Sequence, residues 1–225
     1  MTALDALAAT PRWVAWRVET RRGKPTKVPY APGGRKAKAD DPSTWGIRTA
    51  VQARAARIVN VQGGGIGIQL GDLDGGKHLG GIDLDSCIAA DGTLAPWALK
   101  ILGAVPTYTE RSPSGRGLKL FFCAASEDVR RFLDRIGVRP DVWGTRRGLP
   151  GEDARDHGPA VEVYFAGRFF TVTGERWPGT LDELTTLGCS IANSTTAASI
   201  AGSTRLARIG FARLISCSAS SPPLS

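Results

Sequence analysis

The glycine-rich segment between Gly65 and Cys87 constrains the fold of this chain most strongly. It contains two short apolar runs, GIGIQLG (65–71) and GGIDLDS (80–86), whose composition is typical of strands. The intervening DLDGGKHLG is rich in Gly and Asp, which favour tight turns. We therefore predict two strands that are joined as a β-hairpin.

The rest of the chain predicts a mixture of strands and helices. Further strands are expected at 12–19, at the start of 107–117, at 117–124, and on both sides of a turn at 166–167. Helices are expected at 42–58, with Asp41 as the cap and Pro42 in the first turn, and at 93–104, 126–137 and 180–188. The segments 20–42 and 138–159 are expected to be loops. Because strict βα alternation is missing, the expected class is α+β around a largely antiparallel sheet.

Composition places the end of the globular part near residue 190. Residues 1–189 contain all the expected elements and are predicted to form one domain, for which 42% hydrophobic residues supply a core. Residues 190–225 are rich in Ser, Ala and Thr and contain three arginines and no acid. We predict that they form a tail or the start of a linker.

Several classes of protein are disfavoured by the composition. No apolar run approaches the roughly 20 residues that cross a bilayer, and the first residues lack the basic-then-apolar order of a signal peptide. We therefore expect a cytoplasmic protein. The four cysteines are widely spaced and the chain has two histidines, so neither a disulfide framework nor a zinc site is indicated, and buried free thiols are expected.

The formal charge of +8 is concentrated near the N-terminus. Residues 1–50 contain ten Lys/Arg against four Asp/Glu, a local balance of +6. Such charge favours a polyanionic partner such as nucleic acid, although a basic enzyme with a small substrate has the same balance.

Two DxD pairs lie close together but have different surroundings. Asp72 and Asp74 lie among turn glycines, where Asp is common because it bonds to its own backbone. Asp83 and Asp85 instead lie in an apolar strand, so their carboxylates share one face and repel each other unless a positive charge lies between them. This favours a hard divalent cation, Mg²⁺ or Mn²⁺. The alternative is an exposed edge strand that carries two solvated acids.

Two further segments carry residues suited to phosphate chemistry. In SPSGRGLKLFF (112–122), the small residues Ser114 and Gly115 let a phosphate approach the backbone, and Lys119 can neutralise its charge. A tight turn before a core strand is the alternative.

In VEVYFAGRFFTVTG (161–174), Glu162 is a charge among apolar residues and needs a partner, either Arg168 or a shared metal. Together these residues are the components of a two-metal nucleotidyl transferase.

Taken in order, these motifs resemble the primase-polymerase domain of phage and plasmid replication proteins, a branch of the archaeo-eukaryotic primase superfamily. The resemblance covers roughly Pro11 to Pro178 and also includes WVAWR, KPTKVPY and DPSTW. It implies an RRM-like catalytic sheet that is flanked by helices and packed with an N-terminal α/β unit. It also implies DNA primase and polymerase activity on a single-stranded DNA template, with two Mg²⁺ or Mn²⁺ ions and with NTP or dNTP as substrate.

The resemblance assigns roles to the residues that match its motifs. The metal ligands and catalytic carboxylates fall on Asp83, Asp85 and Glu162. The triphosphate contacts fall on Ser114, Gly115 and Lys119, with Arg168 as an additional contact. Many members carry histidine where this chain has Lys119; lysine still holds phosphate but is poorly suited to proton transfer near neutral pH.

The basic segment 21–38 is expected to meet template or nucleotide, through Lys27 above all and through Arg35 and Lys36. The sequence contains no Walker motif, so helicase activity would come from elsewhere and a replicative helicase is an expected partner. Two other functions use the same residues: a metal-dependent nuclease, which needs no triphosphate pocket, and a non-catalytic nucleic-acid-binding domain that keeps the fold.

Overall fold

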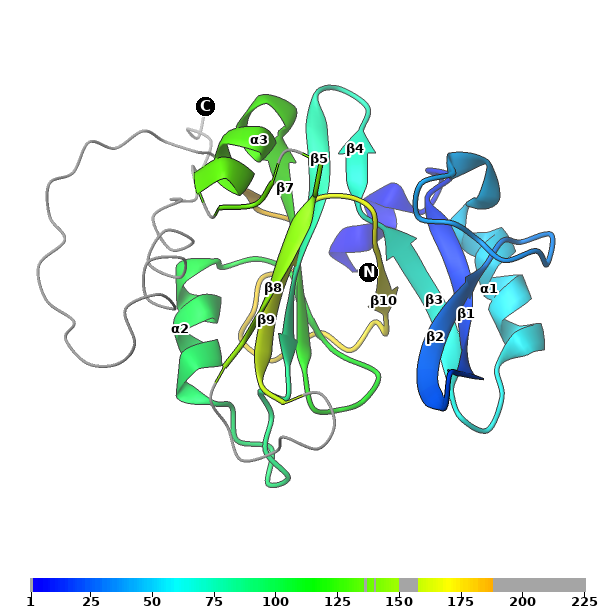
Figure 1. Ribbon diagram of the computed structural model, residues 1–225, viewed down its shortest axis with the longest axis horizontal. Helices are drawn as coiled ribbons and strands as arrows, with labels where there is room; N and C mark the ends of the chain where they lie inside the picture. The colour runs from blue at the N-terminus through cyan, green and yellow to red at the C-terminus, as the bar shows by residue number, and fades with distance from the viewer. Residues whose placement is uncertain (1, 136, 140, 150–157, 188–225) are drawn as a thin grey trace, which may run out of the picture.

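The structure is a computed structural model that describes residues 2–135, 137–139, 141–149 and 158–187. It contains two β-sheets with helices against them, which confirms the α+β class and the largely antiparallel pairing (Figure 1). No helix within the described ranges is long and apolar enough to cross a membrane. The predicted tail lies outside the described residues.

The first sheet has the strand order β10-β3-β1-β2, and all its neighbours are antiparallel. Its strands are β1 (Trp13–Arg21), β2 (Lys24–Tyr30), β3 (Gly64–Gln69) and β10 (Phe169–Val172). Helix α1 (Arg48–Ile58) and the 3-10 helices η1 (Ala3–Leu7) and η2 (Pro42–Thr44) accompany this sheet. Val51, Ala55 and Ile58 of α1 are buried against Trp13 and Ala15 of β1, so one stripe of the helix forms the core.

The second sheet has the order β11-β7-β5-β9-β8, with β4 paired to β5 and β6 paired to β7. Its strands are β4 (Gly71–Leu73), β5 (Lys77–Asp85), β6 (Thr109–Arg111), β7 (Leu118–Ala125), β8 (Gly144–Gly148), β9 (Ala160–Tyr164) and β11 (Thr186–Leu187). Helices α2 (Pro96–Ala104) and α3 (Ser126–Arg135) lie on the face turned away from the first sheet (Figure 1). The opposite face of this sheet is therefore left for the first sheet and for polar residues.

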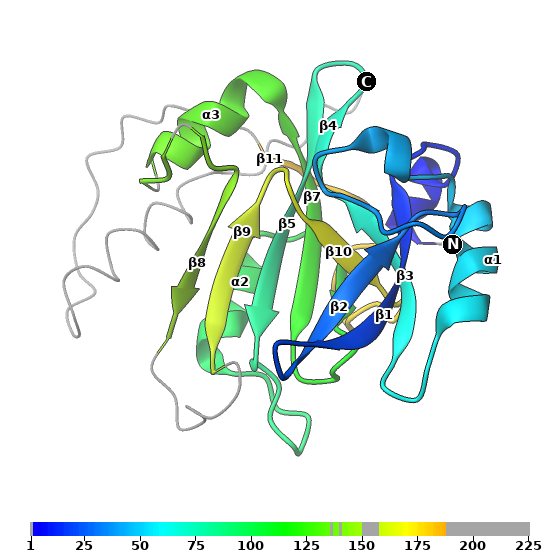
Figure 2. The same ribbon diagram turned by 45° about the vertical axis from the view of Figure 1, so that its right-hand side comes forward.

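The two sheets meet where β10 lies beside β5 and β7 (Figure 2). Phe170 of β10 stacks edge-on against Phe121 of β7, with ring centroids 5.9 Å apart, and both residues belong to one buried cluster. A Cβ at Gly81 of β5 would collide with the Phe170 ring. Glycine at this position therefore allows the two sheets to approach closely.

The predicted hairpin between the strands at 65–71 and 80–86 is wrong, although a hairpin does lie at this place in the chain. The hairpin strands are β4 and β5, whereas β3 belongs to the other sheet. The chain crosses between sheets at Gly71, whose φ of +141° favours glycine. Asp72 lies in β4 opposite His78 and Asp74 lies in the turn, so both belong to this hairpin as predicted.

The prediction of a loop at 20–42 is wrong for its first half. β2 pairs with β1 through a turn at Arg22 and Gly23, which have φ values of +51° and +74°. Proline is excluded from central strands, but β2, which contains Pro25 and Pro29, is the edge strand of its sheet, where a missing N–H is tolerated. The basic segment is therefore part of a sheet.

Two other predicted boundaries also differ. Asp41 caps η2, through a bond from the Ser43 N–H at 3.2 Å, and α1 begins later because Gly46 pairs with Trp13. Part of the predicted loop 138–159 is strand β8, while residues 150–157 lie outside the described ranges.

Residues 180–187 of the predicted helix at 180–188 are not helical; their backbone bonds to Tyr108 and Cys123 and ends in β11. Residue 188 lies outside the described ranges. The strands around Ala166 and Gly167 turn as predicted, but β9 and β10 lie in different sheets. Cys87 is buried and free, as expected, and Cys123 is free and partly buried. Cys189 and Cys217 lie outside the described residues.

Candidate active site

Strand register places five charged residues in one line across the second sheet. The line runs through Glu110 of β6, Lys119 of β7, Asp83 of β5, Glu162 of β9 and Arg146 of β8, each directly opposite the next. Directly opposed residues share a face, and their Cβ atoms lie about 4.5–5.5 Å apart. Asp83 and Glu162, which are far apart in the sequence, are therefore immediate neighbours.

The second aspartate of the motif lies on the same face. Asp85 follows Asp83 by two residues along β5, opposite Ala160 of β9. Ile82 and Leu84 point to the other face, where they are buried in the core under α2 and α3. The strand alternation predicted from GGIDLDSC is thus present and places Asp83 and Asp85 on one face. The register with β9 adds Glu162 to that face.

Lys119 is the cation closest to the first aspartate. Its ammonium is buried, donates to the Asp83 carboxylate, and lies 4.6 Å from the centroid of the Phe170 ring. An ammonium over an aromatic face gains electrostatic stabilisation that partly replaces lost water. The lysine is therefore held beside Asp83 by two contacts from different sheets.

Two arginines flank the third carboxylate. Arg146 Nε lies 2.8 Å from Glu162 Oε1, and its Nη2 lies 3.9 Å from Asp85 Oδ2. Arg168 Nη2 lies 3.0 Å from Glu162 Oε2, so the predicted pairing of Arg168 with Glu162 is present. Arg168 reaches this position because β9 leads directly through the turn into β10.

Asp85 is affected by the charges of the other two carboxylates. Its pKa is raised, first by burial and then by the neighbouring charges of Asp83 and Glu162, while Lys119 and Arg146 oppose the change. The three acids thus form one electrostatic group, which an additional positive charge would stabilise.

The donor set fits a hard divalent ion. Carboxylate oxygens are the ligands that Mg²⁺ and Mn²⁺ favour, and Glu162 Oε2 is buried with no hydrogen bond although it contacts Arg168. Within the described ranges, no three His, Cys, Asp or Glu residues are already grouped as metal ligands. Binding an ion here therefore requires the carboxylates to turn from their lysine and arginine partners.

The serine-glycine turn lies beside the acidic strand. Gly115 has a φ of +72°, and the Gly115 N–H donates to the Ser112 carbonyl at 2.9 Å. Ser112 Oγ lies 3.0 Å from Ser114 Oγ and accepts from the Gly117 N–H at 3.2 Å. A Cβ at Gly117 would lie 2.7 Å from the carbonyl oxygen of Leu84. The exposed Ser114 is thus carried by a turn packed against the residue between the two aspartates.

The three predicted nucleic-acid contacts separate into two places. Lys27 is exposed, yet enough protein surrounds it to lower its pKa, with repulsion from Lys119 as the next cause, while Asp83 and Asp85 oppose the shift. Its ammonium lies 5.6 Å from the centroid of the Trp16 ring. Arg35 and Lys36 contact other groups: Arg35 donates to the Ser43 carbonyl at 3.0 Å, and Lys36 lies 3.8 Å from Glu19.

Sequence reasoning missed two members of the charged line. Arg146 lies in a segment predicted to be a loop, and Glu110 lies in a short strand with no pattern of its own. Glu110 is buried and accepts from the Tyr108 hydroxyl and the Thr173 N–H, both at 2.7 Å. The sequence around Glu110, TYTERS, predicts a strand, but a single acid in it does not distinguish a buried residue from a surface one.

Comparison with known proteins places these features in context. No family model matches the chain. The DNA Primase-polymerase of Nitratiruptor phage NrS-1 is 31% identical to this chain over 191 residues, which is 84% of this chain. The chain spans 22% of the length of that relative. Over most of its length, this protein is therefore a distant relative of part of a phage DNA primase-polymerase.

Proposed function

We propose that this chain is the catalytic part of a DNA primase-polymerase, which transfers nucleotides onto a strand templated by single-stranded DNA. The observation that carries the proposal is the register that sets Glu162 directly opposite Asp83, beside Asp85 and between cations. The similarity to a phage primase-polymerase supports the same reaction. The smaller sheet packed on a larger one agrees with the expected fold of that family.

Three carboxylates would hold the divalent ions. Asp83, Asp85 and Glu162 supply oxygen ligands from neighbouring strands of one sheet, which fixes their spacing better than a loop would. Bound Mg²⁺ or Mn²⁺ supplies activation of the attacking 3′-hydroxyl and stabilisation of the departing pyrophosphate. These three residues are the metal ligands that the resemblance to the family implied.

The cations of the site would bind the triphosphate. Lys119, Arg146 and Arg168 each contact at least one of the three carboxylates, so every acid has a basic neighbour. A triphosphate with its divalent ions brings both signs of charge. The carboxylates can then bind metal and the basic groups can bind phosphate oxygens without leaving an uncompensated charge.

The turn at Ser112–Gly117 would approach the phosphates from the adjoining strand. Its small residues leave the backbone accessible, and Ser114 presents a hydroxyl that can donate. Lys119, which follows the turn, acts in this proposal as a fixed positive charge and not as a proton carrier. The chain therefore orients the α-phosphate for attack mainly through position and charge.

The cations favour synthesis over hydrolysis of nucleic acid. A metal-dependent nuclease needs the carboxylates, but a ring of three basic side chains around them matches a substrate with several phosphates at one point. The decisive experiment measures incorporation of labelled NTP and dNTP on single-stranded templates with Mg²⁺ or Mn²⁺. Incorporation supports the proposal, and template cleavage without incorporation refutes it.

A further inference from the structure

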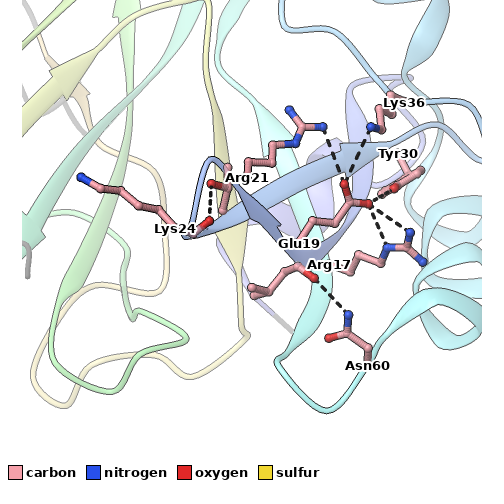
Figure 3. A network of polar contacts seen from close by, with 9 residues as sticks. Arg17, Glu19, Arg21, Lys24, Tyr30, Lys36 and Asn60 are labelled. Carbon is pink, nitrogen blue, oxygen red and sulfur yellow. Dashed lines mark hydrogen bonds and ion pairs between the residues drawn. The ribbon is translucent and has the colours of Figure 1, made fainter.

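A cluster of basic side chains lies on the β1–β2 hairpin and the segment that follows it, and takes no part in the site described above. We call it the Glu19 cluster: Arg17, Glu19, Arg21, Tyr30 and Lys36 (Figure 3). Arg17 donates to Glu19 Oε1 through Nε at 3.1 Å and Nη2 at 3.0 Å, and the Tyr30 hydroxyl donates to the same oxygen. Arg21 and Lys36 each lie 3.8 Å from Glu19 Oε2.

The cluster has an excess of positive charge that is open to solvent. Three cations surround one carboxylate, which leaves a net charge of +2. The exposed fractions of the cationic side chains are 38% for Arg17, 45% for Arg21 and 59% for Lys36. Arg54 of α1 adds a further charge 5.9 Å from the Tyr30 ring. Exposed ion pairs add little to stability, so folding alone does not explain this concentration of charge.

Glu19 gives the cations a common orientation. All of them point to the two oxygens of one carboxylate, as they would to the oxygens of a phosphate (Figure 3). Tyr30 is buried, and the centroid of its ring lies 5.1 Å from the guanidinium carbon of Arg17. The cluster therefore offers charge and hydrogen bonds but no free aromatic face on which a base could stack.

The other face of the same hairpin carries Lys27, whose ammonium lies 5.6 Å from the centroid of the Trp16 ring. Lys27 pairs with Val18 and therefore points away from the face of Glu19, which pairs with Thr26. The charge of Lys27 interacts with Asp83, Asp85 and Lys119. Because β2 is the edge strand of its sheet, a flexible polyanion can pass around this edge from one face to the other.

We infer that the Glu19 cluster binds the phosphate backbone of single-stranded DNA and guides the template around β2 toward the carboxylates. This inference rests on the proposed function for the identity of the polyanion. Binding here is independent of base sequence, because the cluster contacts phosphate and not base edges. It weakens steeply with salt, because each phosphate contact releases counterions.

The test measures binding of fluorescent oligonucleotides of different sequence to the full 225-residue chain, without nucleotides, over a range of salt. The triple variant Arg17→Ala, Arg21→Ala, Lys36→Ala should bind roughly ten-fold or more weakly at low salt. The slope of log affinity against log salt should fall by about 2, since each single-strand phosphate contact contributes about 0.7. The matched control, Arg131→Ala with Arg139→Ala, removes exposed arginines near α3 and should leave affinity unchanged.

Two single variants keep the test independent of folding. Lys36→Glu changes the most exposed cation and should also weaken binding and lower the salt slope. Glu19→Gln keeps the shape, removes the competing negative charge and should tighten binding a few-fold. Unchanged affinity in the triple variant and in Lys36→Glu would overturn the inference. So would equal binding of an oligoglutamate that competes with the oligonucleotide, because the surface would then fit an acidic polypeptide.

The outcome is separable from that of the proposed function. If the wild type incorporates nucleotides but the variants bind DNA normally, the surface is wrong and the enzyme assignment stands. If the variants lose DNA binding while the wild type shows no incorporation under any condition, the surface is correct and the enzyme assignment fails.

Discussion

Two DxD pairs on adjoining parts of one hairpin show how surroundings decide the use of a motif. Asp72 is 74% exposed in its side chain and accepts from Ser126 Oγ at 3.3 Å, while Asp74 lies in the turn. Asp83 is 12% exposed and bonded to Lys119, on a face that also carries Asp85 and Glu162. The same spacing is therefore turn chemistry in one place and a charge cluster in the other. The difference arises because β7 and β9 place Lys119 and Glu162 directly opposite Asp83.

The most direct test of this comparison replaces each pair of aspartates in its own double variant. Asp83→Asn with Asp85→Asn should lower nucleotide incorporation by a factor of about 10³ or more, because the proposed metal ligands are lost. Asp72→Asn with Asp74→Asn should leave incorporation within about two-fold, because exposed substitutions cost little. Steady-state incorporation rates measure both. Comparable losses in the two double variants would show that the pairs do not differ as described.

The carboxylate opposite Asp83 gives the next largest effect. Glu162→Gln should reduce incorporation by roughly 10²–10³-fold, because it removes one ligand and the carboxylate that contacts both Arg146 and Arg168. The exposed Glu175→Gln is the matched control and should have normal activity. Retained activity in Glu162→Gln at several Mg²⁺ concentrations would exclude Glu162 as a ligand.

At the far end of the charged line, Glu110 should affect stability. Glu110→Ala leaves the buried Tyr108 hydroxyl and the Thr173 N–H without acceptors, so the free energy of unfolding should fall by about 1–3 kcal/mol. Asp72→Ala on the exposed hairpin should change it by less than about 0.5 kcal/mol. Urea unfolding of both variants measures the contrast, and similar stabilities would contradict it.

The smallest effect expected within the line is that of Arg146. Arg146→Ala should raise the KM for nucleotide about ten-fold with a smaller change in kcat, because a phosphate contact is lost in both the ground and transition states. Arg147→Ala alters the next residue of β8, which points to the other face, and should leave KM near normal. An unchanged KM in Arg146→Ala would remove this arginine from the triphosphate contacts.

Local pattern predicted the strands that carry the chemistry but not their neighbours. The alternation in GGIDLDSC gave the shared face of Asp83 and Asp85, and the apolar flanks of Glu162 gave its need for partners. Pairing between distant strands depends on register and packing, which no local pattern encodes, so Arg146 and Glu110 were missed.

Two further errors have physical causes. The prolines of KPTKVPY hid β2, because an edge strand tolerates residues that a central strand excludes. The segment 180–188 has helical composition. In its described part, 180–187, the Glu183 carbonyl accepts from the Tyr108 N–H, before β6, and the Thr185 carbonyl accepts from the Cys123 N–H of β7. Tertiary pairing overrode local propensity there.

The central claim is that Asp83, Asp85 and Glu162 together bind a divalent ion, and binding of Mn²⁺ followed by electron paramagnetic resonance tests it most directly. Mn²⁺ binding is measured with a non-hydrolysable nucleoside triphosphate, in the presence and in the absence of protein. We expect the wild type and the Asp72→Asn, Asp74→Asn variant to bind Mn²⁺ together with the triphosphate more tightly than the triphosphate binds it without protein. We expect the Asp83→Asn, Asp85→Asn variant to lose that enhancement. Equal Mn²⁺ binding by all three proteins would contradict the claim.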